Sequence, residues 1–375
     1  MPAVRCRRLL SALLVAVALL AFVATAQSDA LRPRAKATDA GVDLRRAMFG
    51  LGGWAWPNRG EIDALSRRGL RSWRLTLAWE DIQPVRGPYL WSGYDNLIRR
   101  MAAHKLGTML TLTSCPRWAC DGRGPPRTDA GRAAWVAFVR AAVHRYGPSG
   151  LFWRENPGVP ARPVTHWQVM NEVNGVDQWG AYPSAGGYAA FLKLTASAIR
   201  GADANAKVVL AGLGEKMTVW LNAYLPVLYR QPGFAGDFDV MAVEGYATRP
   251  KYLRRIMRTT RRAMRRGGDR AKPVWITEMS WATGGPGPYV TTERGQAAKL
   301  RRAYDLLLFC RKRWNVKRVF WFAHRDRAVP PGEADYWGNH NGLFASDGRW
   351  KPALTAFLRY LRARPPRVRV SSCRL

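Results

Sequence analysis

Two short stretches of the sequence each end on a glutamate that has no evident packing role. Residues 164–170 are largely apolar or β-branched and predict a strand, which runs directly into Asn171 and Glu172. Residues 272–277 predict a second strand, which ends at Glu278. Two carboxyl groups at two strand ends suit a double displacement, in which one protonates the leaving oxygen and the other attacks an anomeric carbon. We therefore predict an acid/base role for Glu172 and a nucleophilic role for Glu278.

Polar residues near other predicted strand ends fit the same chemistry. Arg74 interrupts an apolar strand and either orients a catalytic carboxylate or forms a structural ion pair. The Asn171 amide suits a sugar 2-hydroxyl, a contact that strengthens in the transition state. Tyr246 is placed to donate a hydrogen bond to the nucleophile, while Glu244, two residues earlier, adds a third carboxylate whose role the sequence leaves open.

Three tryptophans follow or lie on predicted strands and are candidates for stacking on sugar rings. These are Trp118, Trp281 and Trp321. Tryptophan offers a large rigid surface with a single hydrogen-bond donor, which suits the apolar face of a sugar. Packing in a hydrophobic core explains each of them as well.

The elements that position these residues alternate between strand and helix along the whole chain. The predicted strands are 48–52, 72–77, 108–112, 164–170, 207–210, 239–243, 272–278 and 318–322. The predicted helices are 61–68, 94–104, 129–146, 187–200, 219–229, 253–266, 295–313 and 352–361. Eight such units predict an α/β fold, a single (β/α)₈ TIM barrel whose strand ends converge on one site. A doubly wound open sheet is disfavoured because no glycine-rich phosphate-binding motif follows the first strand.

The termini predict export. Residues 1–26 have the basic, apolar and small-residue regions of a cleavable signal peptide. The apolar run is shorter than the ~20 residues that span a bilayer, so an N-terminal membrane anchor is the second interpretation. We predict a flexible N-terminal segment at 27–46, the barrel at 47–362 and a basic C-terminal tail at 363–375. No stable membrane insertion is expected of the secreted, extracellular protein.

The net charge of +34 is extreme, and arginine carries much of it. Residues 253–266 alternate apolar and arginine residues at helical spacing, which predicts an amphipathic helix with an arginine-rich outer face. Such a face is either solvated or attracted to an anionic cell-surface polymer. Nucleic-acid binding is not expected, because no nucleic-acid-binding motif accompanies the charge.

The cysteines indicate disulfides rather than a metal site. Cys115 and Cys120 bracket a short loop, and no further cysteine or histidine lies at zinc-ligand spacing. Pairing of Cys310 with Cys373 in the basic tail is left open. We expect no metal ion and no organic cofactor.

The motifs around these residues resemble those of clan A glycoside hydrolases. Asn171-Glu172 resembles the acid/base motif of the fourth strand, and Trp275-Ile276-Thr277-Glu278 the nucleophile motif of the seventh. The segments 320–322, 342–344 and 347–353 are similar to the clan's eighth strand and last helix, and the likeness covers about 47–362. It is greatest to the cellulase-like and β-xylosidase/α-L-iduronidase-like branches. The resemblance implies a second-strand arginine at Arg74 and a tyrosine contacting the nucleophile at Tyr246. The chain departs from it where many relatives have His-x-Tyr, because Glu244 occupies the histidine position.

These observations predict a secreted retaining hydrolase that cleaves O-glycosidic bonds of an oligo- or polysaccharide. A transglycosylase with the same site and a non-catalytic glycan- or polyanion-binding barrel are the alternatives. The sugar, the linkage and the choice of exo- or endo-action are not evident in the sequence. We expect residues 325–341 to form one wall of the cleft.

Overall fold

The computed structural model describes residues 48–53, 55–120, 124–362, 370 and 372–374. All of them belong to one compact unit, Asp43–Leu375. The predicted signal peptide (1–26), the segment 27–46 and most of the tail 363–375 lie outside the described residues. Within the described ranges, no helix is long and apolar enough to cross a membrane.

Eight parallel strands form one sheet in the order β5-β4-β3-β2-β1-β8-β7-β6. They are β1 (Phe49–Gly52), β2 (Ser72–Ala78), β3 (Gly107–Thr113), β4 (His166–Val169), β5 (Lys207–Val209), β6 (Met241–Glu244), β7 (Val274–Glu278) and β8 (Val316–Phe322). Isolated bridges from Val209 to Val240 and from Leu213 to Val243 connect the β5 and β6 ends of this order. The sheet is therefore nearly closed, and the predicted (β/α)₈ barrel is confirmed.

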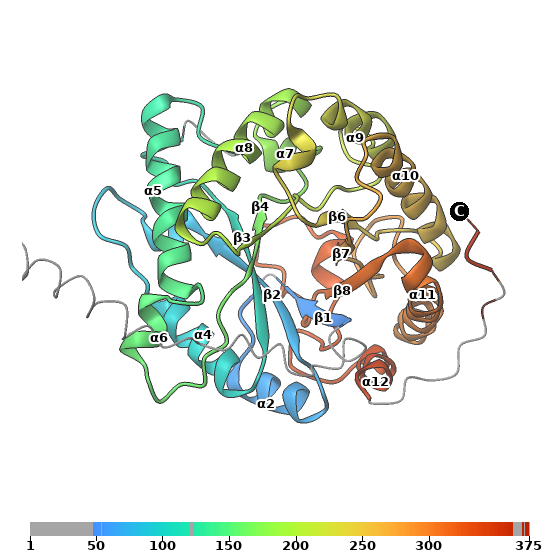
Figure 1. The fold of residues 1–375 in the computed structure, drawn as a ribbon. Coiled ribbons are helices and arrows are strands. Elements are labelled where there is room, and N and C mark those ends of the chain that lie inside the picture. Colours follow the sequence, from blue (N-terminus) through green and yellow to red (C-terminus); the bar gives the residue numbers. More distant parts are fainter. Residues whose placement is uncertain (1–47, 54, 121–123, 363–369, 371, 375) are drawn as a thin grey trace, which may run out of the picture. The chain divides into compact units, whose positions relative to one another are not determined.

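Helices lie around the outside of the strands (Figure 1). The longer ones are α2 (Arg59–Arg67), α4 (Ser92–Ala103), α5 (Asp129–Tyr146), α8 (Ala185–Ala202), α9 (Leu221–Tyr229), α10 (Leu253–Arg266), α11 (Glu293–Trp314) and α12 (Pro352–Leu358). Short helices that the sequence pattern did not predict occupy loops: α3 (Trp79–Ile82), α6 (Leu151–Glu155) and α7 (Val176–Trp179). The remaining short pieces are 3₁₀ turns, η1 (Phe234–Gly236), η2 (Pro250–Tyr252), η3 (Trp337–His340) and η4 (Arg359–Leu361).

Local sequence explains where several helices begin. The Asn58 side chain accepts a hydrogen bond from the Glu61 backbone N–H, and the Glu61 carboxylate accepts one from the Asn58 backbone N–H, which is a complete capping box for α2. Thr128, Ser184 and Thr292 cap α5, α8 and α11 through their side-chain oxygens. Each cap satisfies a backbone N–H that the helix itself leaves free.

Two disulfides are present. The expected Cys115–Cys120 bond closes a short loop after β3, with Cα atoms 6.0 Å apart. Cys310–Cys373, left open by the sequence, joins α11 to the C-terminal tail with Cα atoms 5.4 Å apart. The tail residue Cys373 also accepts a hydrogen bond from the Trp314 indole, 3.2 Å away.

Candidate active site

Arg74, in the middle of β2, connects three strands at the centre of the site. Its guanidinium donates to Gln168 Oε1 (2.8 Å), Glu278 Oε1 (2.7 Å) and Asn171 Oδ1 (2.9 Å). Thr111 on β3 donates to the same Gln168 oxygen at 3.0 Å. Because Arg74 is almost fully buried, its charge is held close to the carboxylate that it contacts rather than screened by water.

Glu278, the last residue of β7, is surrounded by hydrogen-bond donors. Oε1 accepts from Arg74 and, at 3.2 Å, from the Asn171 amide. Oε2 accepts from the Tyr246 hydroxyl at 2.8 Å. Donors on both oxygens and an adjacent cation stabilise the ionised carboxylate, which is the form that a nucleophile requires. Burial and the neighbouring Glu278 charge raise the pKa of Tyr246 well above its usual value, so the tyrosine keeps its proton for this contact.

Glu172 follows β4 in a backbone conformation that is uncommon for residues other than glycine. Its φ is +43°, and that of Met170 is +63°. Such outliers concentrate at functional sites, where the surrounding structure holds them in place. Here the Glu172 N–H donates to Gly212 O at 2.9 Å, so a backbone contact fixes the turn. Burial, and next the charge of Glu278, raise the pKa of Glu172, as a general acid requires.

Glu244, the last residue of β6, lies opposite Glu278 in the strand register. Its side chain is completely buried. Its carboxyl lies close enough to that of Glu172 for a hydrogen bond to form if one of the two holds a proton. The site therefore contains three carboxyl groups from three different strand ends.

Aromatic side chains from the three segments that follow β6, β7 and β8 stand beside the carboxyl groups. The rings of Tyr246, Tyr289 and Trp337 contact one another, with centroids 4.7–5.9 Å apart. Tyr336 packs against Trp337 and is 38% exposed. Since Tyr246 touches Glu278, this aromatic wall (residues 246, 289, 336 and 337) lies next to the Glu278 carboxylate.

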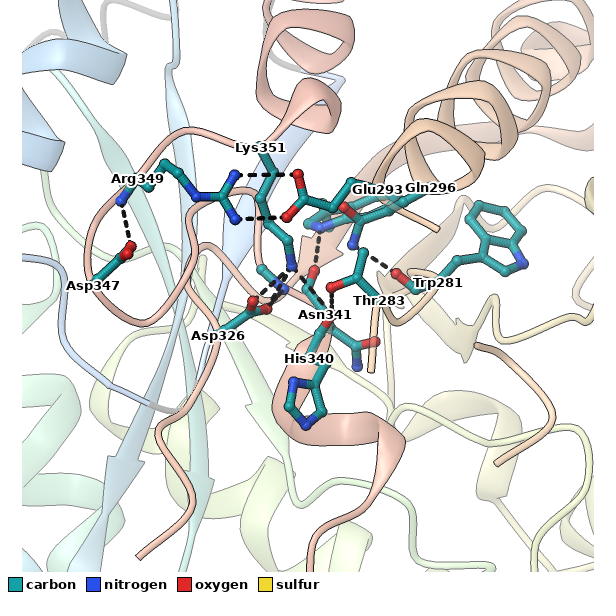
Figure 2. Close-up of polar contacts among 12 residues, drawn as sticks. Trp281, Thr283, Glu293, Gln296, Asp326, His340, Asn341, Asp347, Arg349 and Lys351 are labelled. Carbon is teal, nitrogen blue, oxygen red and sulfur yellow. Dashed lines mark hydrogen bonds and ion pairs between the residues drawn. The ribbon is translucent and has the colours of Figure 1, made fainter. Parts of the chain in front are cut away.

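A polar network holds the loop that carries Tyr336 and Trp337 (Figure 2). The Lys351 ammonium contacts both carboxylate oxygens of Asp326 at 2.9 and 2.7 Å, which ties the two ends of the loop together. Lys351 is 1% exposed, and burial lowers its pKa. The loop also meets the segment after β7, because the Thr283 N–H donates to His340 O and the Trp337 N–H to Pro286 O.

The three candidate tryptophans are not part of this aromatic wall, and they differ from one another in exposure. Trp281 and Trp321 are fully buried, and their indole N–H groups donate to Ala247 O and Asn341 O. Trp118 is partly exposed, donates to Gln83 O and packs edge-on against Trp79. Contact of any of the three with a substrate stays a prediction, and the buried pair exposes no ring face to a sugar.

Sequence reasoning did not identify Gln168, Tyr289 or Trp337. Gln168 carried a signal similar to that of Arg74, a polar residue inside an apolar strand. Tyr289 and Trp337 lie in loops rich in glycine and proline, where no periodicity indicates the direction of a side chain. In the residues that the structure describes, no group of three or more His, Cys, Asp or Glu side chains is arranged to hold a metal ion.

Comparisons with known proteins agree with this fold. No protein-family model matches the chain. No curated protein matches it significantly. A family 39 glycoside hydrolase from Bacteroides cellulosilyticus WH2 superposes with a TM-score of 0.62 at 19% identity over 85% of this chain. GH5_18 from Bifidobacterium longum subsp. longum, in complex with Manb1-4GlcNAc, gives 0.60 at 17% identity over 84% of this chain. An exo-β-1,4-mannosidase from an Opitutaceae bacterium gives 0.61 at 17% identity over 84% of this chain.

The chain spans 64%, 78% and 59% of the lengths of these three proteins. At this identity the similarity concerns the fold, and all three have names that denote glycoside hydrolases. The resemblance to clan A glycoside hydrolases predicted from the sequence is thus confirmed for the barrel.

Proposed function

We propose that this protein is a retaining glycoside hydrolase that cleaves O-glycosidic bonds with Glu172 and Glu278. The observation that carries the proposal is the contrast between these two carboxyl groups. Glu278 has donors on both oxygens and the Arg74 charge beside it, whereas burial raises the pKa of Glu172. Two carboxyl groups in such different environments are suited to opposite tasks, one as nucleophile and one as acid.

In the first step, Glu172 gives its proton to the glycosidic oxygen while Glu278 attacks the anomeric carbon and the C–O bond breaks. A covalent glycosyl-enzyme forms and the leaving group departs as an alcohol. In the second step, Glu172 takes a proton from water, whose oxygen attacks the same carbon and releases Glu278. Arg74 and Tyr246 stabilise the carboxylate before attack and after release. In this proposal the Asn171 amide contacts the sugar 2-hydroxyl.

Substrate binding is assigned to the aromatic wall. Tyr336 and Trp337 are partly exposed and adjoin the nucleophile through Tyr246. A sugar ring stacked on Trp337 would present its apolar face to the indole, an arrangement that suits a saccharide with equatorial hydroxyls more than a flexible acyclic ligand. The name of one barrel neighbour, an exo-β-1,4-mannosidase, supports this class of ligand, as does the Manb1-4GlcNAc bound to GH5_18.

Mechanism-based labelling tests the reaction. We expect 2-deoxy-2-fluoro glycosides, tried as a panel of sugars, to leave a covalent adduct on Glu278 that peptide mass spectrometry locates. The sugar that labels then identifies the donor. Glu278→Ala should fold normally and take no label, and Asp129→Asn, which removes an exposed carboxyl group on α5, is the control that keeps the nucleophile and the aromatic wall. An adduct on Glu244 instead would reassign the nucleophile.

We also propose that the protein is exported and is attracted to an anionic cell-surface polymer. Four arginines on the outer face of α10 are exposed and have no ion-pair partner among the described residues: Arg258, Arg262, Arg265 and Arg266. Arg255, one turn earlier, pairs with Glu215 at 2.5 Å. A row of unpaired cations on a secreted hydrolase would concentrate it on an acidic polysaccharide surface.

Two alternatives are separated by the same experiments. A transglycosylase would form the Glu278 adduct and pass the sugar to another alcohol, so product analysis with and without an added acceptor distinguishes it. A non-catalytic glycan-binding barrel would bind sugars and label with none of the panel. The three-carboxyl site favours the catalytic proposals, because burying carboxyl groups destabilises a fold and clusters of such groups are typical of functional sites.

A further inference from the structure

Glu244 has no role in the reaction described above, although it is the most deeply buried of the three carboxyl groups. It ends β6 with 0% exposure, opposite Glu278. Neither of its oxygens accepts a hydrogen bond from any N–H or O–H group in the described part of the chain. A buried charge without a donor is strongly unfavourable, and such a group keeps its proton instead.

Among the described residues, the Glu172 carboxyl is the group close enough to share a proton with the Glu244 carboxyl, and no N–H or O–H donor bonds to Glu244. Two ionised carboxylates are acceptors only and repel each other, so a hydrogen bond between them requires a proton on one of the two. The backbone holds the pair together. The Glu172 N–H donates to Gly212 O at 2.9 Å, and the Glu244 N–H donates to the carbonyl of Leu213, the residue after Gly212, at 3.0 Å.

Two glycines beside the pair leave space and supply no side-chain donor. A Cβ on Gly212 would lie 2.8 Å from Asn171 Oδ1 and 3.2 Å from Glu244 Oε1. A Cβ on Gly214 would lie 3.6 Å from Glu244 Oε2. The nearest atom to a Cβ at 212 would be Thr277 Oγ1, at 2.6 Å. A larger residue at 212 would therefore press on Thr277 and on the amide next to the acid/base.

The charges around Glu244 determine which carboxyl keeps the proton. Glu172 and Glu278 face it as acids, Arg74 as a cation and Tyr246 as a neutral phenol; Tyr289 lies further along the same wall. Arg74 is bonded to Glu278, so its charge is largely offset there. Burial, followed by the charges of the other two glutamates, raises the pKa of Glu244 well above its usual value.

We propose that Glu244 is a positioning residue for the acid/base: it retains a proton throughout the cycle and donates it in a hydrogen bond to the Glu172 carboxylate. When Glu172 releases its own proton to the leaving oxygen, the new carboxylate accepts from Glu244. When Glu172 takes a proton from water, that bond weakens again. No proton leaves Glu244 in either step, so the overall reaction is unchanged. This inference rests on the proposed function, because it takes Glu172 to be the acid/base. The NMR test below does not depend on that function, because it measures only which glutamates hold a proton.

The test is a ¹³C NMR titration of protein labelled at the glutamate carboxyl carbons. In the wild type, one glutamate signal should stay in its protonated position at neutral pH and be absent from Glu244→Gln. A second signal, absent from Glu172→Gln, should titrate above the ordinary glutamate range. Methionine in Glu244→Met cannot donate a hydrogen bond to the Glu172 carboxylate, so the titration midpoint of Glu172 should move to higher pH. In Glu244→Gln the amide N–H can donate that bond, so the midpoint should stay near the wild-type value.

Glu215→Gln is the matched control, since Glu215 lies on the same segment after β5 but pairs with Arg255. It should leave both signals unchanged. The proposal is overturned if no glutamate is protonated at neutral pH, or if Glu172 titrates identically in the wild type and in Glu244→Met. Circular dichroism identifies any variant that fails to fold, and the Gln variant keeps the test valid if the Met variant does not fold.

A kinetic test follows once a substrate is known. Loss of a hydrogen bond to a charged group corresponds to about a tenfold change in rate. Glu244→Met should therefore hydrolyse a glycoside with an alkyl leaving group about tenfold more slowly, and one with a dinitrophenyl leaving group, which needs no proton, at nearly the wild-type rate for bond cleavage. Equal losses on both substrates would indicate a structural role only. Absence of turnover in the wild type would contradict the proposed function while leaving the NMR result intact.

Discussion

At the scale of single residues, the main feature of the site is the close approach of several ionisable groups. Three carboxyl groups and one arginine share a buried space, and the donors are unevenly distributed among them. Glu278 receives three hydrogen bonds, whereas Glu244 has none from any N–H or O–H group other than a carboxyl in the described chain. This inequality allows one carboxyl to be ionised while its neighbours hold protons.

Because the Glu244 carboxyl lacks donors, the free energy of unfolding should depend on pH, and this dependence should be weaker in Glu244→Gln. A carboxyl whose pKa is raised by folding contributes its full stability below the pKa of the unfolded chain, which is near 4.3 for glutamate. As pH rises from there toward the folded pKa, the free energy of unfolding falls by about 1.4 kcal/mol per pH unit. Glu244→Gln removes this proton linkage, so its melting temperature should exceed that of the wild type at neutral pH and converge with it in acid. Thermal melts at several pH values check this, and a parallel pair of curves would contradict it.

At the scale of elements, the strand ends and the loops contribute different things. β2, β4, β6 and β7 bring Arg74, Glu172, Glu244 and Glu278 to one end of the barrel. The loops after β7 and β8 bring Tyr289, Tyr336 and Trp337, and they are held by contacts with each other. Chemistry therefore depends on the sheet, whereas the shape presented to a substrate depends on loops, as is usual in barrels of this kind.

The buried Lys351–Asp326 pair at the base of the β8–α12 loop should be important for stability (Figure 2). Asp326→Ala leaves an unpaired buried ammonium and should lower the free energy of unfolding by about 3–5 kcal/mol. Arg349→Ala, which breaks the exposed Arg349–Glu293 pair in the same region, should change it by no more than ~1 kcal/mol. Chemical denaturation measures both. Similar losses in the two variants would mean that burial of the pair does not matter.

At the scale of the whole molecule, charge is the dominant feature. The chain carries 60 lysine and arginine residues against 26 acidic ones. Some arginines are neutralised by specific partners, such as Arg74 with Glu278 and Arg145 with Asp95. The exposed arginines of α10 named above have no ion-pair partner among the described residues. A net positive charge attracts polyanions over distances of about a Debye length, ~8 Å in physiological salt.

Reversal of charge on α10 tests whether that attraction is local. The triple variant Arg258→Glu, Arg262→Glu, Arg265→Glu should elute from a heparin column at clearly lower salt than the wild type. The control reverses three exposed cations on other helices, Arg140, Arg154 and Lys193, and has the same net charge. If the two triple variants elute together, net charge alone explains the binding and the α10 face has no particular part in it.

The sequence by itself determined the sequence of elements and the ends of the chemically important strands. Alternation of strand and helix is a local property, because apolar spacing follows the period of each element. Eight units of this kind predicted the barrel, and the barrel brought Glu172 and Glu278 to the same rim although they are far apart in the chain. Arg74 was evident because a cation within an apolar strand must find a partner.

Only the tertiary structure decided what surrounds these residues. Trp281 and Trp321 follow or lie on strands as a stacking residue would, yet packing against other elements buries both completely. Trp337 lies at the site because the Lys351–Asp326 ion pair joins the two ends of its loop and because the loop hydrogen-bonds to the segment after β7. The contact between Glu244 and Glu172 likewise joins β6 to β4, with bare glycines between them. Such contacts depend on which side chains meet across the sheet and between loops. The spacing of apolar residues along the chain predicts helices and strands, but it does not predict these long-range contacts.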